Sequence, residues 1–240
     1  MAISVPKVLL FGSSSTQYGY SEDGCWVSVI ADKLQRRCDV INRGYSGYNT
    51  RWARLMLPKL VTKETANDIA AMVIFFGAND SVLKDLNPHQ HVPLEEYQDN
   101  LSSMITYLKS CGLGSNRIIL IGPPPCDEQH WKERMDAEGR PQSKSQEQTA
   151  LYAKACESVH KSHGTGFVDL YTDMLKAGAE GDSWKSFLND GLHFSAAGSK
   201  FLAERLWQQL EGIVSDIGMI FPDWKTVDYV NPEAVFSAIN

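Results

Sequence analysis

Several features of other protein classes are absent from this sequence of 240 residues. It has no run of Lys and Arg, and its formal net charge is −6, so a phosphate-binding surface for nucleic acid is not expected. No segment approaches the ~20 apolar residues of a membrane-spanning helix. The five cysteines are scattered and lack the close pairs of zinc or redox motifs. These absences predict no nucleic-acid partner, no membrane span and no bound metal.

The compartment is suggested by the first residues and by the cysteines. Residues 1–7 lack the charged start and separate apolar stretch of a secretory signal. An odd number of scattered cysteines is typical of a chain kept in reducing conditions. We therefore expect a cytoplasmic protein, and the sequence leaves open whether it forms a homodimer.

Short apolar segments alternate along the chain with longer stretches of helical spacing. The apolar segments are 8–11, 40–41, 72–76, 118–121 and 167–170, and the helical stretches are about 25–37, 51–62, 94–111, 145–162 and 196–215. Most of the apolar segments lack polar alternation, as strands buried on both faces do. The alternation predicts one three-layer α/β/α domain over residues 1–240, with a five-stranded parallel sheet in the flavodoxin-like order 2-1-3-4-5.

Two segments fall outside this alternation. Residues 123–144 begin with three prolines, are polar, and are longer than an ordinary connection. They are a candidate lid or specificity loop, with a solvated excursion as the alternative. Residues 221–240 mix aromatic residues with prolines, which we interpret as a packed C-terminal tail.

Residues able to carry hydrolytic chemistry follow the predicted strands. Ser14 comes after the first strand, Asn79 after the third, and Asp190 and His193 share a short loop after the fifth. The carboxyl ends of parallel strands meet at one edge of a sheet, where ligands bind. A serine needs a base to take its proton, and that base needs an acceptor that fixes its tautomer. His193 and Asp190 are of the right types for these two roles.

Four sequence blocks carry a resemblance to a known family. They are FGSS at 11–14, NRGYSG at 42–47, GAND at 77–80 and DGLH at 190–193. In this order they resemble the blocks of the SGNH, or GDSL, hydrolases, and they span nearly the whole chain. Residues 42–52, 75–81 and 93–97 look more closely like the isoamyl acetate-hydrolysing esterase branch of that family.

The resemblance implies a role for each matched residue. Ser14 would be the nucleophile, His193 the base and Asp190 its orienting acid. The oxyanion hole would consist of the backbone N–H groups of Ser14 and Gly44 and the side-chain amide of Asn79. The implied activity is that of a serine esterase, which hydrolyses short-chain, acetate-type esters through an acyl-enzyme intermediate and needs no cofactor. Its expected partner is a small-molecule ester.

One position departs from the family pattern. Ser13 stands where the Gly-Asp-Ser motif has aspartate, while the flanking residues keep Ser14, rather than Ser13 or Ser15, aligned with the nucleophile. A hydroxyl lacks the ionised, two-oxygen acceptor of a carboxylate, so hydrogen bonds that hold this turn would be weaker or rerouted. Ser13 therefore leaves open a catalytically impaired ligand-binding homologue. Two further alternatives stay open: an acyl thioesterase or lysophospholipase, because the same machinery cleaves several acyl linkages, and a nucleotide-binding flavodoxin-like module, because the architecture alternates in the same way.

Overall fold

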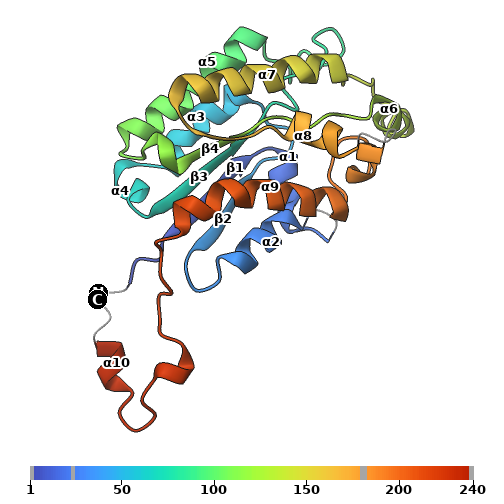
Figure 1. Ribbon diagram of the computed structural model, residues 1–240. Helices are drawn as coiled ribbons and strands as arrows, with labels where there is room; N and C mark the ends of the chain where they lie inside the picture. Colours follow the sequence, from blue (N-terminus) through green and yellow to red (C-terminus); the bar gives the residue numbers. More distant parts are fainter. Residues whose placement is uncertain (1–2, 23–24, 179–182, 238–240) are drawn as a thin grey trace.

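A parallel five-stranded sheet forms the centre of the computed structural model, which describes residues 3–22, 25–178 and 183–237. The strands are β1 (Lys7–Gly12), β2 (Asp39–Gly44), β3 (Ile69–Phe75), β4 (Ile118–Ile121) and β5 (Gly166–Val168). Their order is β2-β1-β3-β4-β5, and all four pairings are parallel (Figure 1). The predicted fold class and strand order are confirmed.

Helices cover both faces of this sheet (Figure 1). The α-helices are α1 (Ser14–Gln17), α2 (Trp26–Lys33), α3 (Thr50–Leu60), α4 (Lys63–Ala66), α5 (Leu94–Ser110), α6 (Glu128–Ala137), α7 (Gln146–His163), α8 (Leu170–Ala177), α9 (Ala196–Val214) and α10 (Glu233–Ser237). Short 3₁₀ helices are η1 (Tyr18–Tyr20), η2 (Ser115–Arg117), η3 (Ser183–Phe187) and η4 (Trp224–Thr226). Residues of α3, α5 and α7 pack on one face, and residues of α2, α8 and α9 pack on the other.

Burial on both faces explains why the strands are apolar without interruption. Along β1, Val8 and Leu10 point into the core under α2 and α9, while Leu9 and Phe11 point into the core under α3 and α5. Successive side chains of a strand alternate between faces, so a strand with two covered faces has no position for a solvated side chain. The side chains of β3 alternate between the same two cores, so this central strand is packed on both faces.

Side-chain caps determine where several helices begin at the edge that carries the site. Asn49 accepts a hydrogen bond from the Trp52 N–H at the start of α3, and Ser145 accepts one from the Gln148 N–H at the start of α7. Ser195 accepts one from the Gly198 N–H at the start of α9. Such caps satisfy N–H groups that have no partner within the helix.

The segment 123–144, the candidate lid or specificity loop, contains helix α6. Only Trp131 and Met135 of that helix are buried, so its apolar pattern is too sparse to indicate a helix from sequence. Asp127 caps its first turn by accepting from the Gln129 and His130 N–H groups, and the helix lies at one end of the domain (Figure 1).

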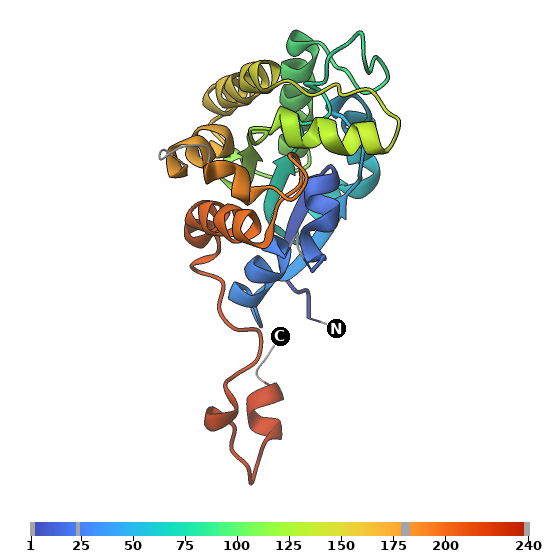
Figure 2. The same cartoon turned by 90° about the vertical axis from the view of Figure 1, so that its right-hand side faces the viewer.

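The prediction of a packed C-terminal tail is wrong for residues 221–237. This segment extends away from the sheet (Figures 1 and 2), and 77% of Trp224 and 93% of Tyr229 is exposed. It is attached to the domain where the Arg36 guanidinium donates to the carbonyl oxygens of Phe221 (2.7 Å) and Pro222 (2.6 Å). Apolar composition indicates a tendency to be buried, but it does not specify a surface that provides the burial.

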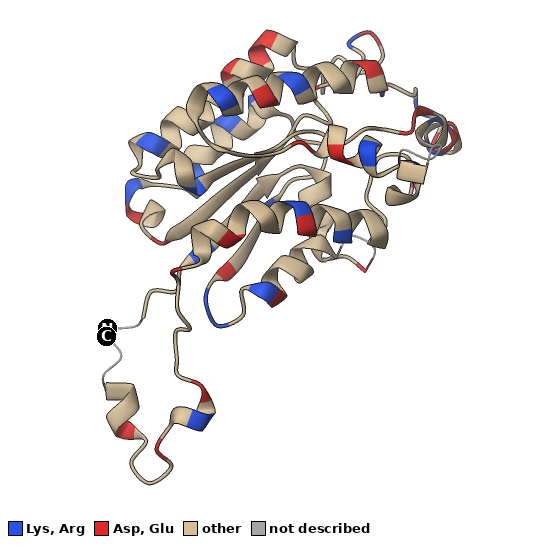
Figure 3. Cartoon of the chain, viewed as in Figure 1, with Lys and Arg blue, Asp and Glu red and all other residues tan. Residues whose placement is uncertain are grey.

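Charged residues are distributed over the outer helices, with Lys and Arg interspersed among Asp and Glu (Figure 3). Strands β3, β4 and β5 contain no charged residue, in keeping with their burial. None of the helices in the described ranges combines the length and apolarity needed to cross a bilayer.

The exposed tail leads to a prediction about stability. Removing residues 223–240 keeps both carbonyls bound by Arg36, so we expect thermal unfolding to shift by less than about 2 °C. The control is Leu206→Ala, a fully buried position in α9, which should cost about 2–5 kcal/mol. Circular dichroism melts of the two variants measure both effects. A truncation as damaging as the core substitution would contradict this view of the tail.

Candidate active site

Ser14 lies directly beyond the carboxyl end of β1. The chain turns at Ser13 and begins α1, so Ser14 is the first residue of that helix. The Ser13 N–H donates to the carbonyl of Phe75 at 3.3 Å, which ties the turn to β3. A Cβ at Gly12 would lie 2.7 Å from that carbonyl oxygen, so the tight turn requires glycine at this position.

Asp190 organises the loop that presents His193. Its Oδ1 accepts hydrogen bonds from the N–H groups of Leu192 (3.0 Å) and His193 (2.7 Å). Gly191, which directly follows Asp190, has φ +86°. This value favours glycine because residues with a side chain rarely adopt this backbone conformation. The Asn189 N–H donates to the His193 carbonyl at 2.8 Å and closes the turn.

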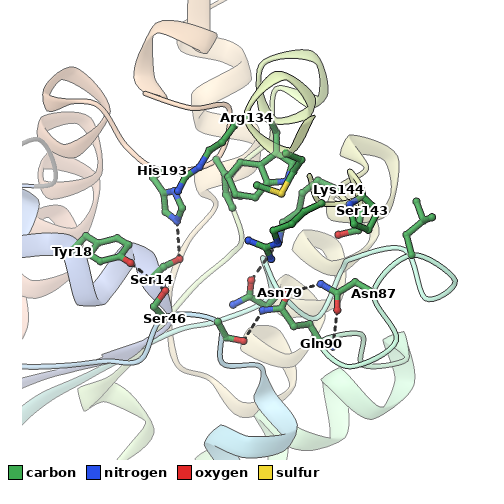
Figure 4. Close-up of a pocket in the computed structure, with 17 residues that line it drawn as sticks. Ser14, Tyr18, Ser46, Asn79, Asn87, Gln90, Arg134, Ser143, Lys144 and His193 are labelled. Carbon is green, nitrogen blue, oxygen red and sulfur yellow. Dashed lines mark hydrogen bonds between the residues drawn. The ribbon is translucent and has the colours of Figure 1, made fainter. Parts of the chain in front are cut away.

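The three predicted catalytic side chains form one hydrogen-bonded chain. His193 Nδ1 is 2.7 Å from Asp190 Oδ2, and His193 Nε2 is 3.0 Å from Ser14 Oγ (Figure 4). The rings of Tyr18 and Trp131 meet the imidazole edge to face, with centroids 5.6 Å and 5.9 Å away. Packing from two sides thus restricts rotation of the ring that links serine to aspartate.

The pKa of Asp190 is held well below its usual range. Burial acts to raise the pKa, but the hydrogen bond and charge of His193 and the backbone N–H groups of His193 and Leu192 outweigh it. The Arg134 guanidinium also donates to Asp190 Oδ2. Asp190 is therefore ionised throughout the neutral range and stabilises positive charge on the imidazole.

Ser14 and His193 open onto a cleft of about 470 Å³. One wall is contributed by α6 and by the end of segment 123–144, and the opposite wall by the turns after β2 and β3. Residues that line the cleft include Tyr18, Gly47, Asn79, Gln90, Trp131, Arg134, Lys144 and Leu192 (Figure 4). Polar side chains therefore make up most of the lining, with Trp131, Met135 and Leu192 among the apolar contacts.

The amide of Asn79 reaches this cleft from the turn after β3. Its Nδ2 donates to the Tyr48 carbonyl at 2.9 Å, and its Oδ1 accepts from Lys144 Nζ at 3.4 Å. The residue is 6% exposed, so the amide is largely withdrawn from water. One N–H of the amide remains after the bond to Tyr48.

Gly44 does not occupy the position that the resemblance implied. Its N–H donates to Asn42 Oδ1 at 2.8 Å, and Gly44 does not line the cleft. A Cβ there would lie 1.9 Å from the Gln17 nitrogen, so Gly44 allows β2 to pack closely against α1. Gly47, with φ +82°, lines the cleft, and no described residue accepts a hydrogen bond from its N–H. The Gly44 N–H is therefore not directed into the cleft, and Gly47 is the glycine of this block that lines it.

The comparison with protein families decides the relationship of this chain. A model of the GDSL-like lipase/acylhydrolase family matches residues 10–201. The chain belongs to this family. The resemblance inferred from four short blocks is thus confirmed, and the GDSL-like protein is a carboxylic ester hydrolase.

Individual relatives of this GDSL-like hydrolase cover almost all of it. It is similar to the human isoamyl acetate-hydrolyzing esterase 1 homolog, with 46% identity over 97% of this chain and 92% of the relative. It is 33% identical to the isoamyl acetate-hydrolyzing esterase of Saccharomyces cerevisiae over 85% of this chain and 86% of that protein. The crystal structure of the lipase/acylhydrolase from Enterococcus faecalis is 27% identical, with a TM-score of 0.66, over 87% of this chain and 96% of that one.

Two cationic residues of the GDSL-like hydrolase at the site were not identified from sequence. Arg134 contacts Asp190, and Lys144 contacts Asn79, and both come from segment 123–144. The polarity and length of that segment marked it as a candidate specificity loop, but they do not show which side chains point inward. Within the described ranges, no group of His, Cys, Asp and Glu is arranged to hold a metal ion.

We expect substitution of Gly44 and of Gly47 by alanine to lower the free energy of unfolding by different amounts. Gly44→Ala forces a Cβ against the backbone of α1, and we expect a loss of about 3 kcal/mol or more. Gly47→Ala meets only an ordinary contact, 3.5 Å from Gln90 Nε2, and should lose about 1–2 kcal/mol from its positive φ. Chemical denaturation of both variants measures the difference. Equal losses would show that Gly44 is not the tighter packing position.

Proposed function

We propose that this protein is a serine esterase that hydrolyses short-chain, acetate-type carboxylic esters through an acyl-enzyme on Ser14. The observation that carries the proposal is the continuous hydrogen-bonded chain from Asp190 through His193 to Ser14 at the edge of the cleft. The same three roles recur in serine hydrolases of unrelated folds, where geometry identifies them. The scattered cysteines favour the cytosol as the place of this reaction.

In the first half of the reaction, His193 Nε2 takes the proton of Ser14 as Oγ attacks the ester carbonyl carbon. The imidazolium that forms is stabilised by ionised Asp190 through the 2.7 Å contact at Nδ1. It then protonates the alcohol oxygen as the carbon–oxygen bond breaks, which leaves the acyl group on Ser14. In the second half, His193 activates water, which attacks the acyl group and releases the acid.

Three N–H donors are available for the negative charge that develops on the carbonyl oxygen. They are the backbone N–H of Ser14, the backbone N–H of Gly47 and the free amide N–H of Asn79. Preorganised donors of this kind are each worth about 2.7–4 kcal/mol of transition-state stabilisation. A neutral amide suits this role because it donates without taking the proton of Ser14.

The preference for small acetate esters is supported by the relatives and by the cleft. The yeast relative is named for the hydrolysis of isoamyl acetate, an ester of a short acid and a small branched alcohol. The cleft offers Trp131, Met135 and Leu192 as apolar contacts, which suit a small alkyl group. Rates of hydrolysis measured separately for p-nitrophenyl esters from acetate to decanoate, for acetyl-CoA and for a lysophospholipid distinguish a short-chain esterase from a thioesterase or lysophospholipase.

Active-site labelling tests the proposed function. We expect a fluorophosphonate to form one adduct that mass mapping places on Ser14, with loss of p-nitrophenyl acetate hydrolysis. Ser14→Ala should abolish both, and His193→Ala should lower the labelling rate by about 10³-fold or more, because the serine loses its base. Lys84→Met, an exposed position, is the control. An adduct on Ser13 or Ser15, or full activity in Ser14→Ala, would overturn the assignment.

Ser13 leads to a second prediction about activity. Its hydroxyl does not bond the N–H groups of α1, whereas its carbonyl accepts from the N–H groups of Thr16 (3.1 Å) and Gln17 (2.9 Å). Backbone bonds therefore hold the turn, and Ser14 lies within reach of His193. We expect Ser13→Asp to raise kcat/KM by less than about tenfold, or 1.4 kcal/mol. Steady-state kinetics with Ser13→Ala as the control measure this, and a gain above about 100-fold would show that Ser13 impairs the natural enzyme.

A further inference from the structure

A buried lysine lies behind the amide of Asn79. Lys144 is 4% exposed, and its Nζ donates to the Ala78 carbonyl at 2.6 Å and to Asn79 Oδ1 at 3.4 Å. In Figure 4 the Lys144 side chain extends from the end of segment 123–144 towards Asn79. The proposed nucleophile, base and orienting acid make no hydrogen bond to it within the described part of the chain.

The burial of this ammonium group is costly. No described carboxylate lies within ion-pair distance of Lys144 Nζ. Burial lowers the pKa of Lys144 to about 8, against the opposing influence of Cys126 and Asp80. An apolar side chain of similar volume would avoid this cost. The cost indicates that the donor groups of the lysine serve a purpose at this position.

The contacts of Asn79 show what that purpose is. A carboxamide has two ends of similar size, and only the nitrogen end donates to an oxyanion. A lysine only donates and a backbone carbonyl only accepts, so Lys144 selects the Oδ1 end and the Tyr48 carbonyl selects the Nδ2 end. Together they exclude the flipped amide and leave the second N–H of Asn79 for the cleft.

The backbone around Lys144 is itself held firmly. The Gln142 side chain accepts from the Lys144 N–H and donates to the Lys144 carbonyl, the latter at 2.8 Å. The adjacent Ser143 carbonyl accepts from the Leu83 N–H at 2.8 Å, and Ser145 caps α7. A side chain that starts from a fixed backbone loses little further entropy when it holds a partner in place.

We propose that Lys144 is a positioning residue that holds the Asn79 amide in the orientation needed to donate to the oxyanion. The inference rests on the proposed function, in which Asn79 is one of the three oxyanion donors. Lys144 acts through Asn79 rather than by touching the ester. The segment expected to be a specificity loop therefore contributes to the chemical step.

Kinetics of Lys144→Met test this role. Methionine keeps an unbranched chain and removes the donor and the charge, so we expect kcat for p-nitrophenyl acetate to fall about 10–100-fold with KM changed less than about threefold. Lys144→Arg keeps a donor cation and should retain more activity than Lys144→Met. Lys84→Met, which changes an exposed lysine in the same way, should match the wild type. Thermal melts establish that each variant is folded.

A double substitution distinguishes positioning from a general structural effect. If Lys144 acts through the amide, Lys144→Met should lower kcat by less than about threefold in an Asn79→Ala background. A merely structural role would instead give the same loss in both backgrounds. Equal losses, or full kcat in Lys144→Met, would overturn the proposal even with fluorophosphonate labelling of Ser14 intact. Full activity in Ser14→Ala would instead reject the proposed function itself.

The pH profile of kcat gives a second readout. As pH rises through about 8, Lys144 loses its proton and charge, so wild-type kcat should decline there, and Lys144→Met should lack this decline. The groups around Lys144 do not account for such a step. Asp80 has its pKa raised to about 6, Cys126 has its pKa raised to about 11, and the pKa of Arg134 in the same cleft is raised by its hydrogen bond to Glu138. A decline that persists unchanged in Lys144→Met would count against the proposal.

Discussion

The parallel pairing of β1 with β3 is the constraint on which the site depends. Its register sets Gly12 opposite Phe75, so the turn that carries Ser14 begins beside the turn that carries Asn79. The bond from the Ser13 N–H to the Phe75 carbonyl continues this pairing past the end of the strand. Because both strands are buried on both faces, the register cannot slip without moving apolar side chains to the wrong layer. The proposed nucleophile and the amide of Asn79 are thus placed by the most buried part of the protein.

Helix α6 and the loop of His193 behave as one structural unit. The Asp127 N–H donates to the Gly191 carbonyl at 2.9 Å, and a Cβ on Gly191 would lie 2.5 Å from the Asp127 carbonyl oxygen. Arg134 adds a contact from the same helix to Asp190. The helix that forms a wall of the cleft therefore also supports the proposed acid and base, and a displacement of α6 would disturb the hydrogen-bonded chain of Asp190, His193 and Ser14 as well as the cleft.

A buried polar layer supports the amide of Asn79 from the other side. The Thr50 N–H donates to Asp80 Oδ1 at 2.9 Å at the start of α3. Asn49, which caps that helix, donates to the Gln90 carbonyl at 2.9 Å. These bonds fix the chain next to the Tyr48 carbonyl, so the acceptor that orients the amide is as well anchored as Lys144. Buried polar groups of this kind favour an arrangement that leaves few of them unpaired.

The local pattern of residues was enough to predict the apolar strands, because burial on two faces is visible within a short segment. The sheet order followed from the general preference of doubly wound sheets, and the roles of Ser14, His193 and Asp190 followed from the resemblance of four blocks to the SGNH family. The local pattern did not separate Gly44 from Gly47, since both lie in one block and only the direction of each N–H distinguishes them. Nor did it place the aromatic residues of the tail or the inward path of Lys144. Tertiary structure decided these points, because the partner of an N–H, a ring or an ammonium group is supplied by distant parts of the chain, and a local pattern does not specify which part that is.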